Sequence, residues 1–279
     1  MKVSKYVILN ILNNIISISL GLSQHFLIKW NLKTNNFIHN FCFMSIIYIS
    51  RNYILLYLIE YFSRNKKKIC DKESSFPKEE YKYEFNKYLI MNTMVESGFH
   101  SLFINKILNN GLSRNLSYDL ILFIPISFLY EVIYDFFYYL LHRSFHHKFI
   151  YKYFHKVHHK FKHPIPILLY YQHPIDWFLV TTVPTIISLY FIPSITHLQF
   201  DLILVYKTGV ELYGHCGRKV YPLTTLPQFP WLVKFLNIGL FAEDHDLHHS
   251  INNCNYGKRF SLWDKVFNTY INGHEYILK

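Results

Sequence analysis

Three clusters of histidine stand out in the second half of the chain, at residues 142–146, 155–159 and 245–249. Within each cluster histidines recur three or four residues apart, so an α-helix would place their imidazoles on one face, one turn apart. Two or three imidazoles on one helical face are typical ligands for a transition metal. The candidate ligands in these clusters are His142, His146, His155, His158, His159, His245, His248 and His249.

The alternative is that the clusters arise by chance in a chain with 17 histidines. Single histidines such as His147, His163 and His197 are better explained as surface or hydrogen-bonded side chains. Three clusters that share a helical spacing are not explained in this way, because unpaired polar groups are costly beside a membrane.

The first two clusters constrain the path of the chain between them. His155 follows His146 by nine residues, which is about two and a half turns of α-helix. In one straight helix the two clusters would therefore face opposite ways. If both serve one site, the helix must bend or unwind between Lys148 and Phe154.

Acidic residues lie on the apolar run that leads into the first cluster. Glu131, Asp135 and His142 fall on one helical stripe. A carboxylate there could hydrogen bond to a ligand imidazole and orient it, or the stripe could be buried in a bundle without any role at a metal. The second interpretation is favoured for Glu131, and both stay open for Asp135. Glu211 and His215, four residues apart, form a further carboxylate–imidazole pair.

About nine or ten nitrogen ligands are too many for one metal ion, so two ions are the natural number. Imidazole accepts iron, zinc, copper or nickel, and the spacing does not choose among them. If the substrate is a membrane lipid, its unactivated C–H bonds call for O₂ activated at iron. A zinc pair would instead serve hydrolysis.

Composition indicates a membrane protein. Of the 279 residues, 51% are hydrophobic and 19% are aromatic, which is high for a soluble chain. The formal net charge is +11, and basic residues such as Arg64 and Lys66–Lys68 flank apolar runs, which favours a cytosolic membrane face over a nucleic-acid groove. The four cysteines form no CxxC pair, so neither a disulfide framework nor a thiolate zinc site is expected.

Apolar runs predict an all-α, multi-pass bundle. Val7–Ile28, Phe41–Phe62 and Tyr118–Leu141 are read as membrane spans, and Leu89–Leu108 as a weaker, amphipathic one. Arg51, near the middle of the second span, should face protein, a cavity or the interface.

The remaining segments decide on which side the clusters lie. Lys66–Lys87 is a polar linker; if this linker and the histidines share the cytosolic side, Leu89–Leu108 must cross or re-enter the membrane. Leu179–Phe191 and Ile195–Tyr206 are each short for a full span and are expected to form a hairpin that returns to the same side. That return would bring the third cluster to the first two.

The chain resembles the fatty acid hydroxylase / sterol desaturase superfamily of integral-membrane di-iron oxygenases, from about Asp119 to Tyr270. The resemblance rests on HRxxHH at His142, HxxHH at His155, QHP at Gln172, ExxxHxG at Glu211 and HDxHH at His245, followed by NYGKRFSLWDKVFNTY. Residues 1–115 carry no family signal and are expected to form N-terminal membrane helices and the linker. Residues 116–279 would be the catalytic domain.

The resemblance implies two iron ions on the cytosolic side of the endoplasmic reticulum membrane, with electrons from NAD(P)H through cytochrome b5 or its reductase. It implies these ligands: His142, His146, His155, His158, His159, His215, His245, His248 and His249. Members differ at the position of Glu211, which could be a ligand or an acid behind one. Asp264 is expected to hold a ligand histidine, and the role of His173 stays open. Asn268-Thr269 stands where the family has Gly-Thr, which should affect only a turn.

The function expected from these features is O₂-dependent hydroxylation or desaturation of a lipid, with a sphingoid base or fatty acyl chain favoured over a sterol. No nucleic-acid partner is expected. The rival is a membrane protein that binds or transports metal through intramembrane histidines. The position of the clusters at the ends of apolar runs argues against a conduit.

Overall fold

The computed structural model describes residues 2–31, 36–70, 79–104, 108, 115–220 and 228–273, and in this part of the chain the secondary structure is helical, without a strand. The α-helices are α1 (Lys2–Asn31), α2 (Phe37–Ser63), α3 (Lys82–Phe99), α5 (Leu116–Phe145), α6 (Lys148–Tyr151), α7 (Pro174–Asp176), α8 (Val183–Phe191), α9 (His197–Gly214), α10 (Pro230–Phe235), α11 (Ala242–Ile251) and α12 (Leu262–Val266). Short 3₁₀ turns cover Glu79–Tyr81, His155–Lys160 and Pro166–Leu169, and π-helical turns cover His100–Ile104 and Trp177–Thr182.

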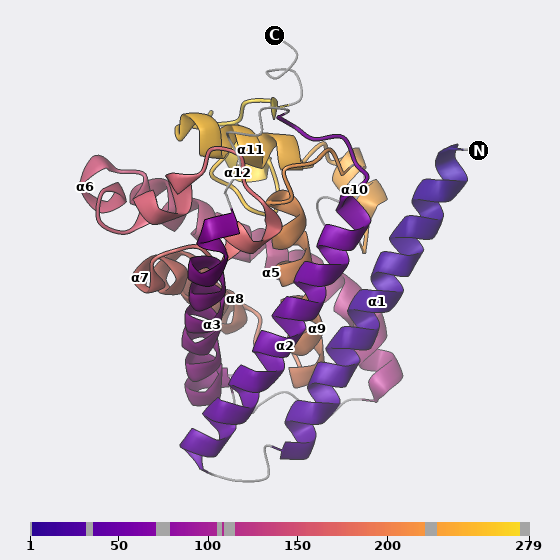
Figure 1. Cartoon of the computed structure of the whole chain (residues 1–279). Coiled ribbons are helices and arrows are strands. Elements are labelled where there is room, and N and C mark those ends of the chain that lie inside the picture. Colours follow the sequence, from indigo (N-terminus) through magenta and orange to yellow (C-terminus); the bar gives the residue numbers. More distant parts are fainter. Residues whose placement is uncertain are drawn as a thin grey trace.

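The long helices form a bundle, and the short helices α10, α11 and α12 gather at one end of it (Figure 1). We call that end the cap. Four helical segments are long and apolar enough to cross a membrane: Val7–Trp30, Phe37–Ser63, Leu116–Phe145 and Pro174–Phe191. The predicted all-α, multi-pass fold is confirmed.

Two of the predicted segments differ from the observed ones. The first arm of the expected hairpin begins earlier, at Pro174, and is therefore long enough to span. α3 is too polar to count as a span, yet it packs along α2 and runs the depth of the bundle. The predicted Leu89–Leu108 segment extends beyond it into residues that are only partly described, and much of the predicted Lys66–Lys87 linker lies outside the described residues.

Local sequence signals explain where the helices begin. The Asn36 and Asn115 side chains accept hydrogen bonds from the amide N–H groups of the first turns of α2 and α5. α9 begins with a capping box, in which Thr196 and Gln199 each accept the other's backbone N–H.

The interior of the bundle contains a polar network. Arg51 is buried, donates to Gln24 and Asn52, and lies 3.8 Å from Glu96. Gln24 in turn donates to Asp201 at 2.7 Å. The network links α1, α2, α3 and α9, and it confirms that Arg51 faces protein.

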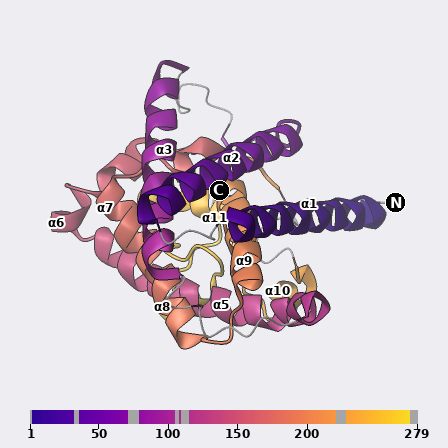
Figure 2. The same cartoon turned by 90° about the horizontal axis from the view of Figure 1, so that it is seen from below.

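α1 and α9 approach each other closely at Gly21. A Cβ atom there would lie 2.6 Å from Leu202 Cδ2 and 3.2 Å from Leu202 Cα. Only glycine lets the two helices meet at this distance. The view along the bundle shows α1 beside α9, with α5 and α8 on the other side (Figure 2).

The lysine-rich segment after α2 lies at the cap. Lys68 pairs with Arg218 in an isolated β-bridge, Lys219 N–H donates to the Lys67 carbonyl, and Arg218 Nη1 donates to the Lys66 carbonyl. The histidine clusters are at the same end, as the next subsection describes. The lysine-rich segment and the clusters therefore lie at one end of the bundle, which is the condition under which the predicted Leu89–Leu108 segment must cross or re-enter the membrane.

Candidate metal centre

Nine buried or half-buried imidazoles converge beneath the cap and divide into two sets. The five-histidine group contains His142, His146, His155, His159 and His248. The four-histidine group contains His158, His215, His245 and His249. Within each group one ligand atom per residue lies within 4.8 Å of every other. All nine histidines expected from the sequence and its resemblance are brought together.

Four elements deliver these side chains. α5 ends at Phe145, so His142 lies in its last turn and His146 caps it. The chain turns at residues 146–147, forms the short helix α6 and turns again at residues 152–154, so the predicted break is present but begins before Lys148. His215 caps α9, and the third cluster lies on α11, as predicted.

The second cluster is not α-helical, contrary to the expectation. It forms a 3₁₀ turn in which His159 leaves the helical region, with φ −85° and ψ 16°. A regular 3₁₀ turn would stack residues i and i+3, which would pair His155 with His158. His159 Nε2 instead lies 3.1 Å from His155 Nε2, and His158 belongs to the other group.

The second and third clusters follow the same rule. In each, the histidines at i and i+4 join one group and the histidine at i+3 joins the other. His155 and His159 share a group with His248, whereas His245 and His249 share one with His158. Each cluster therefore serves both groups.

Ring nitrogens face each other at short distances. His142 Nε2 and His159 Nε2 each lie 3.1 Å from His155 Nε2. In the other group, His245 Nε2 lies 3.0 Å from His215 Nε2 and 3.2 Å from His249 Nε2. Two nitrogens bound to one ion at about 2.1 Å and at a right angle would be about 3.0 Å apart, so the spacing suits a shared metal ion.

Acceptors fix the tautomer of four of these rings. The Nδ1 atoms of His142, His215 and His248 lie 2.7–2.8 Å from backbone carbonyls, which are those of Tyr256, Glu211 and Cys254 respectively. His155 Nδ1 lies 2.8 Å from Asp176 Oδ2. These oxygens can only accept, so each Nδ1 carries the proton and each Nε2 of a neutral ring presents a lone pair.

Lone pairs that face each other at 3 Å repel unless a cation lies between them. His142 Nε2 and His155 Nε2 are in this arrangement. His248 Nε2 in one group and His158 Nδ1 in the other are buried and have no hydrogen-bond partner among the described residues. A bound metal ion would satisfy both orphaned atoms, so the residues fit a metal in each group.

Burial keeps the rings neutral, the form that binds metal. Desolvation, and then the neighbouring imidazoles or other charged groups, set the pKa well below its usual value for His158, His159, His245 and His249. Desolvation and Lys258 lower the pKa of His215 to about 3, and desolvation lowers the pKa of His248 to about 3. These rings are therefore neutral at neutral pH, and each has one nitrogen without a proton.

Comparison with known proteins agrees with this geometry. The family model described as fatty acid hydroxylase matches residues 127–269, just over half of the chain. That range contains all nine histidines. The chain belongs to the fatty acid hydroxylase family.

Two curated relatives match shorter stretches. The fatty acid hydroxylase vlmA of Lecanicillium sp. is 37% identical over 82 residues, which cover 26% of this chain and 22% of the relative. Cholesterol 25-hydroxylase-like protein 1, member 2 of Danio rerio is 31% identical over 72 residues, which cover 25% of this chain and 23% of the relative. The chain thus aligns with less than a quarter of the length of either relative. No solved structure matches it.

The candidate carboxylates of this fatty acid hydroxylase family member are Glu211, Asp135 and Asp264. The carboxylate of Glu211 forms ion pairs with three basic side chains. It lies 3.2 Å from Lys207 Nζ, 3.5 Å from Lys258 Nζ and 3.0 Å from Arg259 Nη2. Glu211 belongs to neither ligand group, and its backbone carbonyl, not its carboxylate, contacts His215. A catalytic role for its carboxylate stays a prediction.

Asp135 and Asp264 do not contact a ligand histidine directly, which was the expectation for Asp264 and one of the two interpretations left open for Asp135. Asp135 accepts the backbone N–H groups of Lys258, Arg259 and Phe260. Asp264 accepts those of Tyr256 and Gly257. Both carboxylates hold the backbone of the C-terminal loop.

The sequence interpretation missed Asp176 as the carboxylate that contacts a ligand imidazole. It follows the QHP motif, two residues after Pro174, and that proline begins α7 and sets its direction. His173 caps the same helix, with Nδ1 accepting from Ile175 N–H. His163 pairs with Asp246 outside both groups, and His147 is exposed.

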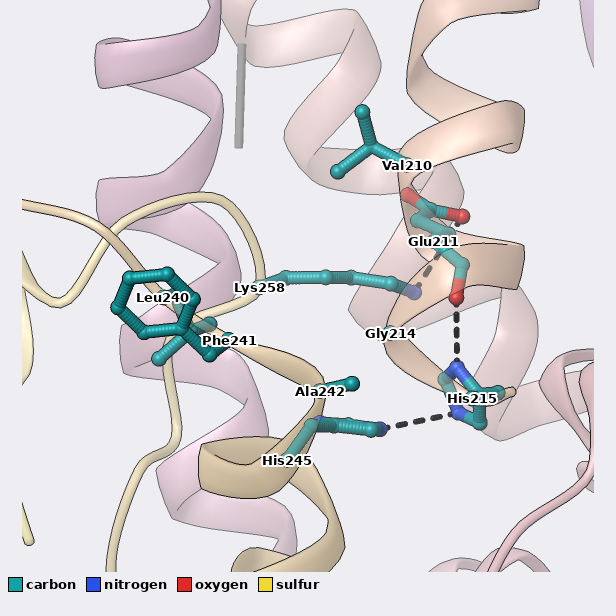
Figure 3. A pocket seen from close by; sticks show the side chains of 9 residues that line it. All are labelled: Val210, Glu211, Gly214, His215, Leu240, Phe241, Ala242, His245 and Lys258. Atoms are coloured by element: carbon teal, nitrogen blue, oxygen red, sulfur yellow. Dashed lines mark hydrogen bonds and ion pairs between the residues drawn. The ribbon is translucent and has the colours of Figure 1, made fainter. Parts of the chain in front are cut away.

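A small cavity opens beside the four-histidine group (Figure 3). His215 and His245 line it, together with Lys258 and apolar side chains such as Leu240 and Phe241. Figure 3 shows Lys258 reaching Glu211 across it and the Glu211 carbonyl facing His215. The space of about 20 Å³ admits roughly one water molecule.

Proposed function

We propose that the protein is a membrane-bound di-iron oxidoreductase that uses O₂ to hydroxylate or desaturate a lipid. The observation that carries the proposal is the pair of buried histidine groups at one end of a membrane-spanning bundle. Family membership supports the same activity. The part of the relatives that aligns is short, so activity and substrate are proposed for this chain.

The nine histidines would hold two iron ions, five ligands to one and four to the other. Bound iron would supply the redox chemistry that an unactivated C–H bond requires. The protein contributes the rest: it buries the site, keeps the imidazoles neutral, and fixes the orientation of four of them through Asp176 and three backbone carbonyls.

For the substrate we favour a sphingoid base or a fatty acyl chain over a sterol. The two relatives are named for a fatty acid and for cholesterol, so the lipid class is common to both. The HCG sequence at His215, Cys216 and Gly217 resembles sphingoid-hydroxylating members more than sterol-modifying ones.

Electrons would come from NAD(P)H through cytochrome b5 or its reductase. We place the protein in the endoplasmic reticulum membrane with the cap in the cytosol, where such donors act. The basic residues at the cap support this orientation, because cytosolic loops are enriched in lysine and arginine.

The test is a lipid profile of cells that express the chain, compared with cells that express a double variant. His158→Ala and His248→Ala remove one ligand from each group. A lipid that gains one oxygen only with the unaltered chain identifies a hydroxylase and names its substrate. A lipid that loses two hydrogens identifies a desaturase. No difference, in a host with working cytochrome b5, would refute the proposal.

The second candidate function is metal binding or transport. Intramembrane polar groups such as His25, His100 and Asp201 favour it, since they lie inside the bundle. However, the metal-ligating histidines form two closed groups at one end. Metal analysis separates the two functions: two tightly held irons per chain favour the oxygenase, and weakly held, exchangeable zinc favours transport.

A further inference from the structure

The loop at residues 254–260 contacts two ligands of the five-histidine group through its backbone. The Cys254 carbonyl accepts from His248 Nδ1, and the Tyr256 carbonyl accepts from His142 Nδ1, both at 2.7 Å. The orientation of two of the five rings therefore depends on where this loop directs its carbonyls.

The N–H groups of the same loop are held from two sides. Asp264 Oδ1 accepts from Tyr256 N–H at 2.8 Å, and its Oδ2 accepts from Gly257 N–H at 2.6 Å. Asp135 Oδ1 accepts from Lys258 N–H at 2.8 Å and from Arg259 N–H at 2.7 Å. Four consecutive peptide units thus point their N–H groups at two buried carboxylates.

We propose that Asp135 and Asp264 are positioning residues that set the five-histidine group through this loop. We call the two carboxylates and residues 254–260 the loop clamp. The N–H of one residue and the C=O of the residue before it share one peptide plane. Asp264 Oδ2, which accepts from Gly257 N–H, therefore directs the Tyr256 carbonyl, and Asp135 holds the next two peptide units. The Cys254 carbonyl shares its plane with Asn255 N–H, which donates to the Thr269 carbonyl, and Thr269 in turn donates to Asp264. The inference rests on the metal centre of the proposed function and adds what controls one of its two ions.

The surroundings leave the clamp little freedom. Thr269 Oγ1 donates to Asp264 Oδ1 at 2.7 Å and lies 3.0 Å from Tyr139 Oη, which ties the carboxylate back to α5. At Gly257 a Cβ atom would lie 2.6 Å from the Phe260 carbonyl oxygen and 2.9 Å from Asp264 Oδ2. The loop therefore has room for only one backbone path.

A carboxylate is required here because both oxygens accept. An asparagine at position 264 has one acceptor oxygen, and its NH₂ group would face a backbone N–H. One buried donor would lose its partner, and the peptide would move away. The Tyr256 carbonyl would then leave His142 Nδ1.

No hydrogen bond among the described residues joins a ring of the four-histidine group to these two carbonyls, and the side chain of the clamp residue Lys258 reaches the Glu211 carboxylate. His215 Nδ1 is fixed by the Glu211 carbonyl, inside α9 and outside the clamp. The arrangement predicts that weakening the clamp affects one ion and spares the other.

The test is a titration of cobalt(II) into the metal-free, full-length protein in detergent, monitored by the visible spectrum of the bound ion. The unaltered chain should bind two ions. Asp264→Asn and Asp135→Asn should each bind one ion as before and the other roughly 10- to 100-fold more weakly, the effect typical of losing a partner behind a metal ligand. The spectrum of the tight ion should match that of His248→Ala, not that of His158→Ala.

The matched control is Asp201→Asn. Asp201 is a buried carboxylate of the same bundle, but it pairs with Gln24 and His25, away from the ligands. Asp201→Asn should bind two ions normally. Retention of the ion in the four-histidine group shows that the clamp variants fold.

Two results would overturn the inference. If Asp264→Asn and Asp135→Asn bind two ions with unaltered affinity, the carboxylates do not position the ligands. If they lose both ions while the control keeps both, the effect of the clamp is not confined to the five-histidine group. An unaltered chain that binds two ions but oxidises no lipid would refute the proposed function and leave the loop clamp standing.

Discussion

His248 and His249 are neighbours in the sequence but belong to different ligand groups. The same is true of His158 and His159. Adjacent residues of a helical turn point about 100° apart, so one short segment can supply both ions only if each ion lies on its own side of the segment. Each HxxHH segment therefore lies between the two ligand groups and contributes histidines to both.

At the residue scale, the partner of His155 gives a direct prediction. Asp176→Asn should weaken metal binding in the five-histidine group by roughly 10- to 100-fold, because an amide no longer fixes the His155 tautomer as a carboxylate does. Metal content after dialysis against a chelator measures the loss.

The matched control for that change is Asp246→Asn. Asp246 makes the same kind of contact, 3.0 Å from His163 Nδ1, but His163 is outside both groups. Metal retention should be unchanged. Equal losses in the two variants would show that the Asp176 contact has no special role at the metal.

The turn chemistry at this scale could be read from the sequence. Asn252 and Asn255 have φ of 62° and 52°, in the left-handed region that asparagine tolerates. Asn268, where the family has glycine, has φ of 56°. The substitution keeps the turn, as expected.

At the element scale, periodicity predicted the helices of the bundle, because apolar runs of this length form helices in a membrane. The histidine set was also predictable, since its spacing and motifs are local. Asp135 and Asp264 were identified from the sequence as candidate site residues, but their contacts with the backbone of residues 256–260 were not predicted. Asp135 contacts residues that lie 123–125 positions later in the sequence, and no local sequence pattern predicts contacts over that range.

The second histidine cluster shows a different limit. Its spacing is that of an α-helix, yet residues 155–160 form a 3₁₀ turn. The third cluster divides its ligands in the same way on the α-helix α11, so neither the spacing nor the division of ligands requires a 3₁₀ turn. Tertiary contacts override local preference in such short segments.

The close approach of α1 and α9 gives a prediction for an element. Gly21→Ala would place a Cβ atom 2.6 Å from Leu202 Cδ2 and 3.2 Å from its Cα. Forcing the helices apart should destabilise the protein by about 1–3 kcal/mol. Thermal unfolding in detergent measures this change.

Gly209→Ala on α9 is the control. No atom lies within 4 Å of a Cβ atom at that position. Alanine is the better helix former by about 0.5–1 kcal/mol, so this variant should be as stable as the unaltered chain or more so. Destabilisation of similar size in both variants would show that Gly21 has no packing role.

At the scale of the whole molecule, the bundle has one functional end. The lysine-rich segment, the C-terminal caps of α5 and α9, and α11 all lie there. α2 has 27 residues and is therefore about 40 Å long, enough to cross a hydrocarbon core of about 30 Å. We therefore expect its two ends to lie on opposite sides of the membrane.

This geometry predicts which positions are reached from the cytosol. In a cysteine-free background, a cysteine restored at position 70, beside the lysine-rich segment, should react with a membrane-impermeant maleimide added to sealed microsomes. A cysteine introduced by Asn36→Cys, at the exposed start of α2, should react only after detergent opens the vesicles. The cap would then face the cytosol, where the proposed electron donors act.

The reverse pattern would be equally informative, because the two positions lie at the ends of one helix. Reaction at position 36 from outside, with position 70 protected, would place both histidine groups in the lumen and remove cytosolic cytochrome b5 as a donor. Reaction of both positions in sealed vesicles would mean that α2 does not cross at all. In that case the side of the membrane on which the histidine clusters lie could no longer be inferred from the number of crossings between the lysine-rich segment and the first cluster.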